Sequence, residues 1–362
     1  MNINNPRIVS FLPSATEIAC ALGLSDSLFG ITHECDYPPH VRSKPVVVRN
    51  VLPIEKMTQS EIDRAVAERM RAGLSLYQID EQLLNEIAPD LILTQDLCQV
   101  CAPSGNEVSQ VLKSLPKTPQ ILWMTPRSVS EIFDNVRDLG AATGRSEEAG
   151  RLVDDCRARL DALSARTSAA ASNPRVFCME WLDPVFASGH WVPELVQAAG
   201  GIDEIGRSGG ESVRVSWEDI AAFAPEVLVI MPCGFNLQQT MKQIWNVFGA
   251  YGSRANSPHF FGLPAVRNNR VYAVDANSYF ARPGPRVVEG AELLAHLIHP
   301  ELFDHVPDVF ANAFQRVDID LLKGILVEGK DYTLENGAMV FTAGYLQRRG
   351  YCCDNGCRNC PY

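Results

Sequence analysis

Two passages far apart in the sequence follow the same order of residue types. Residues 86–93 (EIAPDLIL) and residues 222–229 (AFAPEVLV) each combine the end of a helix, a proline turn, an acid and a buried apolar strand. A helix that leads through a short turn into a buried strand is the repeating unit of parallel αβ sheets. The repetition therefore predicts two similar αβ lobes in one chain.

Short apolar runs alternate with helical patterns through most of the chain. Strands are expected at 7–11, 28–32, 46–48, 91–94 and 121–124 in the first half, and at 175–180, 227–231 and 270–274 in the second. Helices are expected at 60–87, 191–199, 216–223, 236–248 and 285–298. Such alternation favours mostly parallel sheets with helices on both faces.

Two further helices are indicated by their start signals. Ser14 is followed three residues later by Glu17, the spacing of a capping box that satisfies the first backbone N–H groups of a helix. This pair predicts a helix through about Leu22. Ser128 and Glu131 repeat the spacing and predict a second helix start.

The helical pattern after Ser128 continues to about residue 168, with one weak point at Gly144. A helix of that length predicts a rigid spine between two lobes. The expected fold class is α/β, with two Rossmann-like lobes joined by a long spine helix and a small C-terminal cysteine-rich extension. The expected segments are an N-terminal lobe (1–126), the spine (127–170), a C-terminal lobe (171–300) and a linker with a cysteine-rich tail (301–362).

Charge and hydropathy narrow the range of partners. The formal net charge is −11, which argues against nucleic acid or an anionic membrane surface as the main partner. No apolar run approaches the roughly 20 residues that cross a bilayer, so no membrane insertion is expected. The first residues lack a basic segment followed by an apolar one, and we therefore expect a cytoplasmic location.

The last residues of the chain are dense in cysteine. Cys352, Cys353, Cys357 and Cys360 follow the spacing Cys-Cys-x3-Cys-x2-Cys. Thiolates suit zinc or an iron–sulfur cluster, and a metal gives order to a segment with almost no core. The spacing therefore predicts a metal-binding tail, whereas the alternative is a disordered, oxidisable tail.

A second group of chemically active side chains follows predicted strands of the first lobe. His33 and Cys35 come after one strand, and Cys98 and Cys101 after another. Residues past the carboxyl ends of parallel strands line the ligand crevice of open αβ sheets, so these four are expected to converge. The thiols are interpreted as metal or cluster ligands or as soft contacts to a metal chelate, the alternative being small buried apolar groups.

Candidate ligand contacts in the second half are aromatic and basic. Trp181 and Trp191 are suited to the flat apolar walls of a macrocycle site. His190 is suited to meet a metal axially through its neutral imidazole. Arg282 and Arg286 are suited to bidentate binding of a carboxylate or phosphate, and the alternative for both is a surface salt bridge.

Several motifs resemble one known family. Residues 7–17 (RIVSFLPSATE), 30–38 (GITHECDYP), 188–191 (SGHW) and 282–286 (RPGPR) resemble the helical-backbone class of ABC-transporter substrate-binding proteins, nearest the cobalamin-binding branch. The resemblance covers roughly residues 6–300 and implies two αβ lobes joined by one helix, with the ligand in the cleft between them. The tail resembles a small cysteine-rich domain of unknown function.

Two classes of function follow. The first is a cytosolic binding protein for cobalamin or a related tetrapyrrole or metal chelate, held between the lobes. Its expected ligand contacts are His33, Glu34, Trp181, His190, Trp191, Arg282 and Arg286. The second is a metal- or iron–sulfur-dependent enzyme with a Cys/His site in the same cleft, and a metallochaperone is a third possibility.

Overall fold

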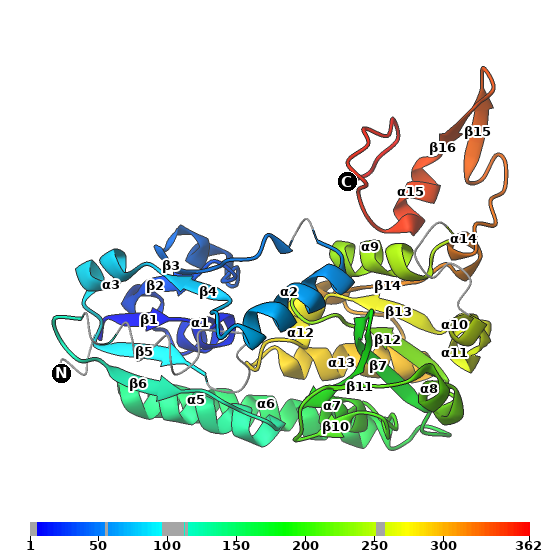
Figure 1. The fold of residues 1–362 in the computed structure, drawn as a ribbon. Helices are drawn as coiled ribbons and strands as arrows, with labels where there is room; N and C mark the ends of the chain where they lie inside the picture. The colour runs from blue at the N-terminus through cyan, green and yellow to red at the C-terminus, as the bar shows by residue number, and fades with distance from the viewer. Residues whose placement is uncertain (1–5, 55–56, 96–111, 113–114, 251–257) are drawn as a thin grey trace. The chain divides into compact units, whose positions relative to one another are not determined.

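The computed structural model describes residues 6–54, 57–95, 112, 115–250 and 258–362. The chain divides into two compact units (Figure 1). The first comprises residues 1–159 and 282–287, and the second comprises residues 160–281 and 288–362. Each unit has its own αβ sheet, so the predicted two-lobed α/β fold with a C-terminal extension is confirmed. The exact segment boundaries stay predictions.

In the described part of the first unit, six strands form one sheet in the order β4-β3-β2-β1-β5-β6. The strands are β1 (Ile8–Ser10), β2 (Leu28–Thr32), β3 (Val46–Asn50), β4 (Tyr77–Ile79), β5 (Leu91–Thr94) and β6 (Gln120–Trp123). Strand β1 is parallel to both of its neighbours, β2 and β5. The carboxyl ends of these three strands therefore share one edge of the sheet, where Ser10, Thr32 and Thr94 end them.

The helices of this unit differ from the sequence prediction in several places. They are α1 (Pro13–Ala21), α2 (Gln59–Arg71), α3 (Glu81–Ile87), α5 (Val129–Thr143) and α6 (Ser146–Thr167), the last of which continues into the second unit. The predicted helix over 60–87 is divided into α2, strand β4 and α3. Gly73 follows α2 with φ +65°, and the carboxylate of Asp80 accepts a bond from the N–H of Leu83 at 2.9 Å to start α3.

The predicted capping box at the start of α1 is wrong. Leu12 is the N-cap and makes no side-chain cap, and the helix begins with Pro13. Proline suits this position because its fixed φ is helical and its missing N–H is not needed there. The carboxylate of Glu17 is bound to arginine side chains instead.

The predicted spine consists of two consecutive helices, α5 and α6. Gly144 separates them with φ +69°, a left-handed conformation that favours glycine. Ser128 caps α5 as predicted, because its hydroxyl accepts the N–H of Glu131 at 3.2 Å. The carboxylate of Glu131 accepts the N–H of Arg127 at 2.6 Å.

The second unit contains a sheet in the order β11-β8-β7-β12-β13-β14 and a short pair, β9 with β10, among its described residues. The strands are β7 (Val176–Leu182), β8 (Val185–Ala187), β9 (Gly189–His190), β10 (Arg207–Ser208), β11 (Val213–Arg214), β12 (Val227–Ile230), β13 (Val271–Val274) and β14 (Phe314–Arg316). The helices before the extension are α7 (Val192–Ala198), α8 (Trp217–Phe223), α9 (Leu237–Phe248), α10 (Pro258–Gly262), α11 (Pro264–Arg267), α12 (Ala276–Tyr279) and α13 (Val287–Ile298).

Helices cover both faces of this sheet (Figure 1). Successive side chains of a strand point to opposite faces of the sheet, so the side chains of Val176 and Phe177 lie on different faces. Phe177 belongs to an apolar cluster with Ile244 of α9. Val176 lies beside Val196 of α7 and Ile298 of α13, all three close to Gly201. The αβα layering predicted from the sequence therefore holds for this unit.

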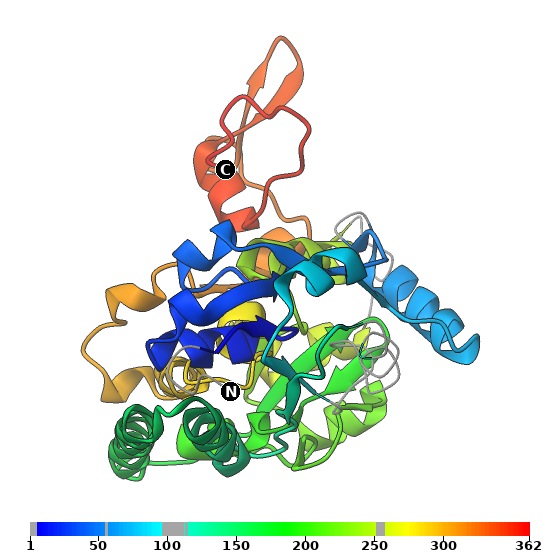
Figure 2. The same ribbon diagram turned by 90° about the vertical axis from the view of Figure 1, so that its left-hand side faces the viewer.

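The C-terminal extension is a small group of helices and strands at the end of the chain (Figure 2). It contains α14 (Ile319–Leu322), the antiparallel hairpin of β15 (Tyr332–Glu335) and β16 (Ala338–Phe341), and α15 (Ala343–Arg349). Leu321, Tyr345 and Leu346 form the centre of an apolar core. In the described part of the chain, no helix is both long and apolar enough to span a bilayer.

Candidate functional site

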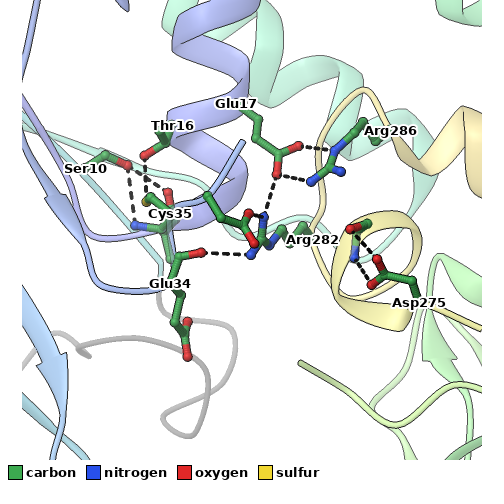
Figure 3. Close-up of polar contacts among 11 residues, drawn as sticks. Ser10, Thr16, Glu17, Glu34, Cys35, Asp275, Arg282 and Arg286 are labelled. Carbon is green, nitrogen blue, oxygen red and sulfur yellow. Dashed lines mark hydrogen bonds and ion pairs between the residues drawn. The ribbon is translucent and has the colours of Figure 1, made fainter. Parts of the chain in front are cut away.

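The segment after β2 carries three residues that the sequence predicted as site residues. The N–H of His33 donates to the carbonyl of Val48 at 3.0 Å, and its Nδ1 lies 3.2 Å from the hydroxyl of Thr32. Glu34 is half-buried, and its carbonyl accepts a bond from Arg282 at 2.8 Å (Figure 3). Parallel pairing of β2 with β1 thus holds His33 and Glu34 at the carboxyl edge of the sheet.

Cys35 is a buried thiol with a local partner. Its Sγ lies 3.1 Å from the hydroxyl of Thr16 (Figure 3). Burial raises the pKa of the Cys35 thiol to about 12, against the opposing effect of the bond to Thr16. The thiolate, which is the form that binds metals, is therefore scarce at neutral pH.

A buried cluster of acids and arginines lies next to this segment (Figure 3). Arg282 donates from Nη1 to Oε1 of Glu17 at 3.0 Å and to Oδ1 of Asp36 at 2.5 Å. Arg286 donates to Glu17 from Nε at 2.8 Å and from Nη2 at 2.5 Å. We call Glu17, Asp36, Arg282 and Arg286 the Glu17 cluster.

The centre of the Glu17 cluster is buried, whereas the Asp36 side chain is 37% exposed. The Glu17 side chain is 3% exposed and that of Arg282 is 5% exposed. Burial would lower the pKa of Arg282, but the carboxylates of Asp36 and Glu17 raise it above its ordinary value. Both guanidinium groups are thus held by acids of their own chain, and the cluster fixes residues 282–286 to α1. The role of Arg282 and Arg286 in ligand binding stays a prediction.

Two residues of the predicted Cys/His site, Cys98 and Cys101, lie outside the described residues. The prediction that they converge with His33 and Cys35 stays a prediction. Within the described ranges, no three His, Cys, Asp or Glu side chains are placed to share a metal ion.

The aromatic candidates of the second unit differ in their surroundings. Trp191 is 5% exposed, and its Nε1 donates to the carbonyl of Phe280 at 2.9 Å. Trp181 at the end of β7 is half-buried and packs edge-to-face on Phe235 with ring centroids 5.6 Å apart. His190 has φ +52° and its ring lies 5.6 Å from that of Trp191. Of the two indoles, Trp181 retains ring surface for a ligand.

Glu180, the residue before Trp181, is a half-buried acid. It accepts bonds from the hydroxyl of Ser212 and, at 3.5 Å, from the N–H of Gly189. Burial raises the pKa of Glu180 to about 7, opposed by the bonds from Ser212 and Gly189 and reinforced by the charge of Asp203. Glu180 therefore titrates near neutral pH.

Asp203 is the partner that sequence reasoning missed. Its carboxylate accepts bonds from the Ser188 hydroxyl at 2.9 Å and from the N–H groups of Ile205 and Gly206 at 3.2 and 2.8 Å. Burial raises its pKa, and these three bonds lower it. The signal in the sequence was an acid followed three residues later by Gly206, which is common to many turns and indicates no site by itself.

The four tail cysteines form two pairs. The Sγ atoms of Cys353 and Cys357 are 3.6 Å apart, and those of Cys352 and Cys360 are 3.8 Å apart. Neither pair is joined by a third metal-binding side chain among the residues that the structure describes. The geometry thus gives no support to a zinc or iron–sulfur site shared by all four thiols.

Comparison with known proteins shows the family. The chain belongs to the periplasmic binding protein family, whose model matches residues 8–278. A family of unknown function, DUF5522, matches residues 323–362 and thus the cysteine-rich extension. The resemblance inferred from the sequence motifs is confirmed for both parts of the chain.

Individual relatives have described ligands. The vitamin B12-binding protein of Vibrio cholerae is 26% identical over 291 residues, covering 79% of this chain and 86% of that protein. The crystal structure of the periplasmic vitamin B12-binding protein of V. cholerae matches with a TM-score of 0.58 and 23% identity, over 82% of this chain and 98% of that one. The periplasmic haem-binding protein of Roseiflexus sp. RS-1 matches with a TM-score of 0.60 and 19% identity, over 83% and 100%. At such identities the solved structures show the fold alone.

The predicted cytoplasmic location is wrong on this comparison. The relatives include periplasmic proteins and a Bacillus subtilis substrate-binding lipoprotein that is 25% identical over 82% of this chain and 81% of that protein. The locations of these relatives thus indicate a compartment outside the cytoplasm for this chain. The composition of the first residues was too weak a signal to decide the compartment.

Proposed function

We propose that the chain is an extracytoplasmic binding protein for a corrinoid such as vitamin B12. The observation that carries the proposal is the 26% identity to a vitamin B12-binding protein over 79% of the chain. A corrinoid is favoured over haem because the haem-binding neighbours match at 19% identity or below. Such a protein would deliver its ligand to an ABC transporter, because a relative is a substrate-binding lipoprotein of such a transporter.

The proposed contacts are side chains that the sequence predicts as ligand contacts. Trp181 would offer its half-buried indole face to the corrin ring, since flat apolar walls recognise macrocycles. His190, which lies against Trp191, and His33 at the carboxyl edge of the first sheet would supply imidazole side chains to the ligand. Glu34 would receive hydrogen bonds from the amide groups at the rim of a corrinoid.

The alternative, an enzyme with a metal or iron–sulfur centre on His33, Cys35, Cys98 and Cys101, is the weaker proposal. The Cys35 thiol is engaged by Thr16 at 3.1 Å, and burial raises its pKa to about 12. A ligand thiolate there would first have to break this contact and lose its proton.

Calorimetric titration of the full chain tests the proposal. We expect cyanocobalamin to bind with a Kd on the order of 1 µM or tighter, and hemin to bind more weakly. Trp181→Ala should weaken cyanocobalamin binding by about tenfold or more, the loss of one stacked aromatic contact.

The matched control for Trp181→Ala is Tyr272→Ala. Tyr272 is a half-buried ring on the same sheet that packs on Phe314 at 6.4 Å, so its loss removes a similar aromatic area. Affinity should be unchanged in this control. The absence of cyanocobalamin binding at millimolar concentration would refute a corrinoid function, and tight binding of hemin alone would replace it with a haem function.

A further inference from the structure

The cysteine loop at the end of the chain brings its four thiols together in a definite arrangement. Four cysteines allow three different pairings. The structure selects one, because the Sγ–Sγ separations are 3.6 Å for Cys353 and Cys357 and 3.8 Å for Cys352 and Cys360. The first pair is nested inside the second in the sequence.

The backbone of the loop holds the pairs in place. Asp354 and Gly356 have φ values of +58° and +64°, which reverse the chain between Cys353 and Cys357. The N–H of Asp354 donates to Sγ of Cys352 at 3.4 Å, and the N–H of Cys360 donates to the carbonyl of Cys357 at 3.1 Å. The conformation of the turn therefore places the paired cysteines next to each other.

Side chains anchor the same loop to the rest of the extension. Arg358 donates to the carboxylate of Glu335 in β15 at 2.7 Å. The amide of Asn359 donates to the carbonyl of Phe341 in β16 at 2.8 Å. Cys357 and Cys360 also pack against the core of Leu321, Tyr345 and Leu346. Anchors between Cys357 and Cys360, at Arg358 and Asn359, restrict which sulfur each of the two cysteines faces.

We propose that the extension forms two nested disulfide bonds, Cys353–Cys357 and Cys352–Cys360, when it meets a thiol oxidant. A disulfide needs an S–S distance of about 2.05 Å, so each pair must approach by less than about 2 Å, within reach of side-chain rotation. A shared metal would instead need at least three of the sulfurs at one point, and within the described ranges no such group occurs. The periplasmic and lipoprotein relatives indicate a compartment in which disulfides persist.

The chemistry of closure is thiol–disulfide exchange with a small or protein disulfide. One thiolate of a pair attacks a sulfur of the oxidant, forms a mixed disulfide and releases one thiolate of the oxidant. The second cysteine of the pair loses its proton and attacks the mixed disulfide, which releases the other half of the oxidant. Each pair is oxidised by two electrons, and one oxidant disulfide is reduced to two thiols. The side chains of all four cysteines are half-buried, so small oxidants have access to them.

The test uses the full-length chain, reduced and then exposed to oxidised glutathione. Free thiols are trapped with iodoacetamide and counted by mass spectrometry on the peptides that carry the four cysteines. Variants that keep one proposed pair, Cys352→Ser with Cys360→Ser and Cys353→Ser with Cys357→Ser, should each close one disulfide at a rate near that of the parent.

Variants that keep a crossed pair are the matched controls. Cys352→Ser with Cys357→Ser, and Cys353→Ser with Cys360→Ser, remove the same number of thiols but should close at least about tenfold more slowly, because the remaining sulfurs have a lower effective concentration. Equal rates in paired and crossed variants would overturn the proposal. So would four thiols that stay reduced, or about one zinc ion per chain that disappears in the paired variants.

Discussion

Replacing Glu17 by Gln should destabilise the first unit strongly. The Glu17 carboxylate accepts three bonds of 2.5 to 3.0 Å from Arg282 and Arg286, and its side chain is 3% exposed. Hydrogen bonds to charged groups contribute about 1.5–3 kcal/mol each. The net loss is smaller than their sum, because Asp36 still neutralises Arg282 and one amide oxygen still accepts. We expect the free energy of unfolding to fall by about 3 kcal/mol, in the range for breaking a buried ion pair.

Urea unfolding and hydrogen exchange together measure this effect. The urea midpoint gives the loss of stability, and hydrogen–deuterium exchange of peptides from α1 assigns it to the first unit. The control is Asp134→Asn, which removes an exposed i,i+3 ion pair with Arg137 at 3.0 Å and should cost less than about 0.5 kcal/mol. If Glu17→Gln costs no more than this control, the charges of the Glu17 cluster are solvated in solution and the reasoning fails.

Two more predictions concern the second unit. Burial raises the pKa of Glu180 from 4.5 to about 7, so the folded protein keeps a proton that the unfolded chain releases, and the free energy of unfolding should fall as pH rises between these values. The Glu180→Gln variant cannot release this proton, so its free energy of unfolding should fall by about 3 kcal/mol less than that of the parent over this pH range. The variant should therefore be more stable than the parent at pH 8. If the free energies of unfolding of parent and variant change equally with pH from 4 to 8, the prediction is wrong. Gly350→Ala should loosen the extension, because φ is +87° and the new Cβ would lie 2.7 Å from Cγ of Met241. The control is Gly337→Ala, which has φ +81° and open space around its Cβ, so it should cost only the backbone strain of about 1–2 kcal/mol. Limited proteolysis of the extension measures both variants. Equal proteolysis rates would mean that the contact with Met241 contributes nothing.

The lobes could be predicted from the sequence because their signals are local. A buried strand is recorded as a run of apolar residues, and the turns at Pro89-Asp90 and Pro225-Glu226 recur at the same place in both units. The long helical pattern was also local, and its weak point at Gly144 became the boundary between α5 and α6. These features can be predicted without knowing which residues pack against each other across the core.

Which side chains meet in the candidate site depends on contacts between residues that are distant in the sequence. Local sequence patterns do not predict such contacts. Glu17 fits a capping box with Ser14 as well as it fits an ion pair, and its partner Arg282 is 265 residues away. The sequence indicates Arg282 and Arg286 as candidate residues for binding an anionic ligand, but only the fold shows that a carboxylate of the same chain meets them. In the same way, the spacing of the tail cysteines fits a metal site and a pair of disulfides equally well, and only the fold shows which sulfurs lie near each other.

The extension is tied to the binding fold and is more than an appended tail. Trp245 of α9 donates from Nε1 to the carbonyl of Arg349 at 2.9 Å. The side-chain amide of Gln315 in β14 donates to the carbonyl of Arg348 at 2.7 Å. Both acceptors belong to the last turn of α15, directly before the cysteine loop. Closure of the nested disulfides would therefore stiffen the segment that follows these bonds, whereas Gly350→Ala would displace it. Disulfide closure should stabilise this segment and Gly350→Ala should destabilise it. Disulfide closure should therefore partly offset the faster proteolysis of Gly350→Ala. A variant that gains no protection on oxidation would place the disulfides and the α9 contact in separate cooperative units.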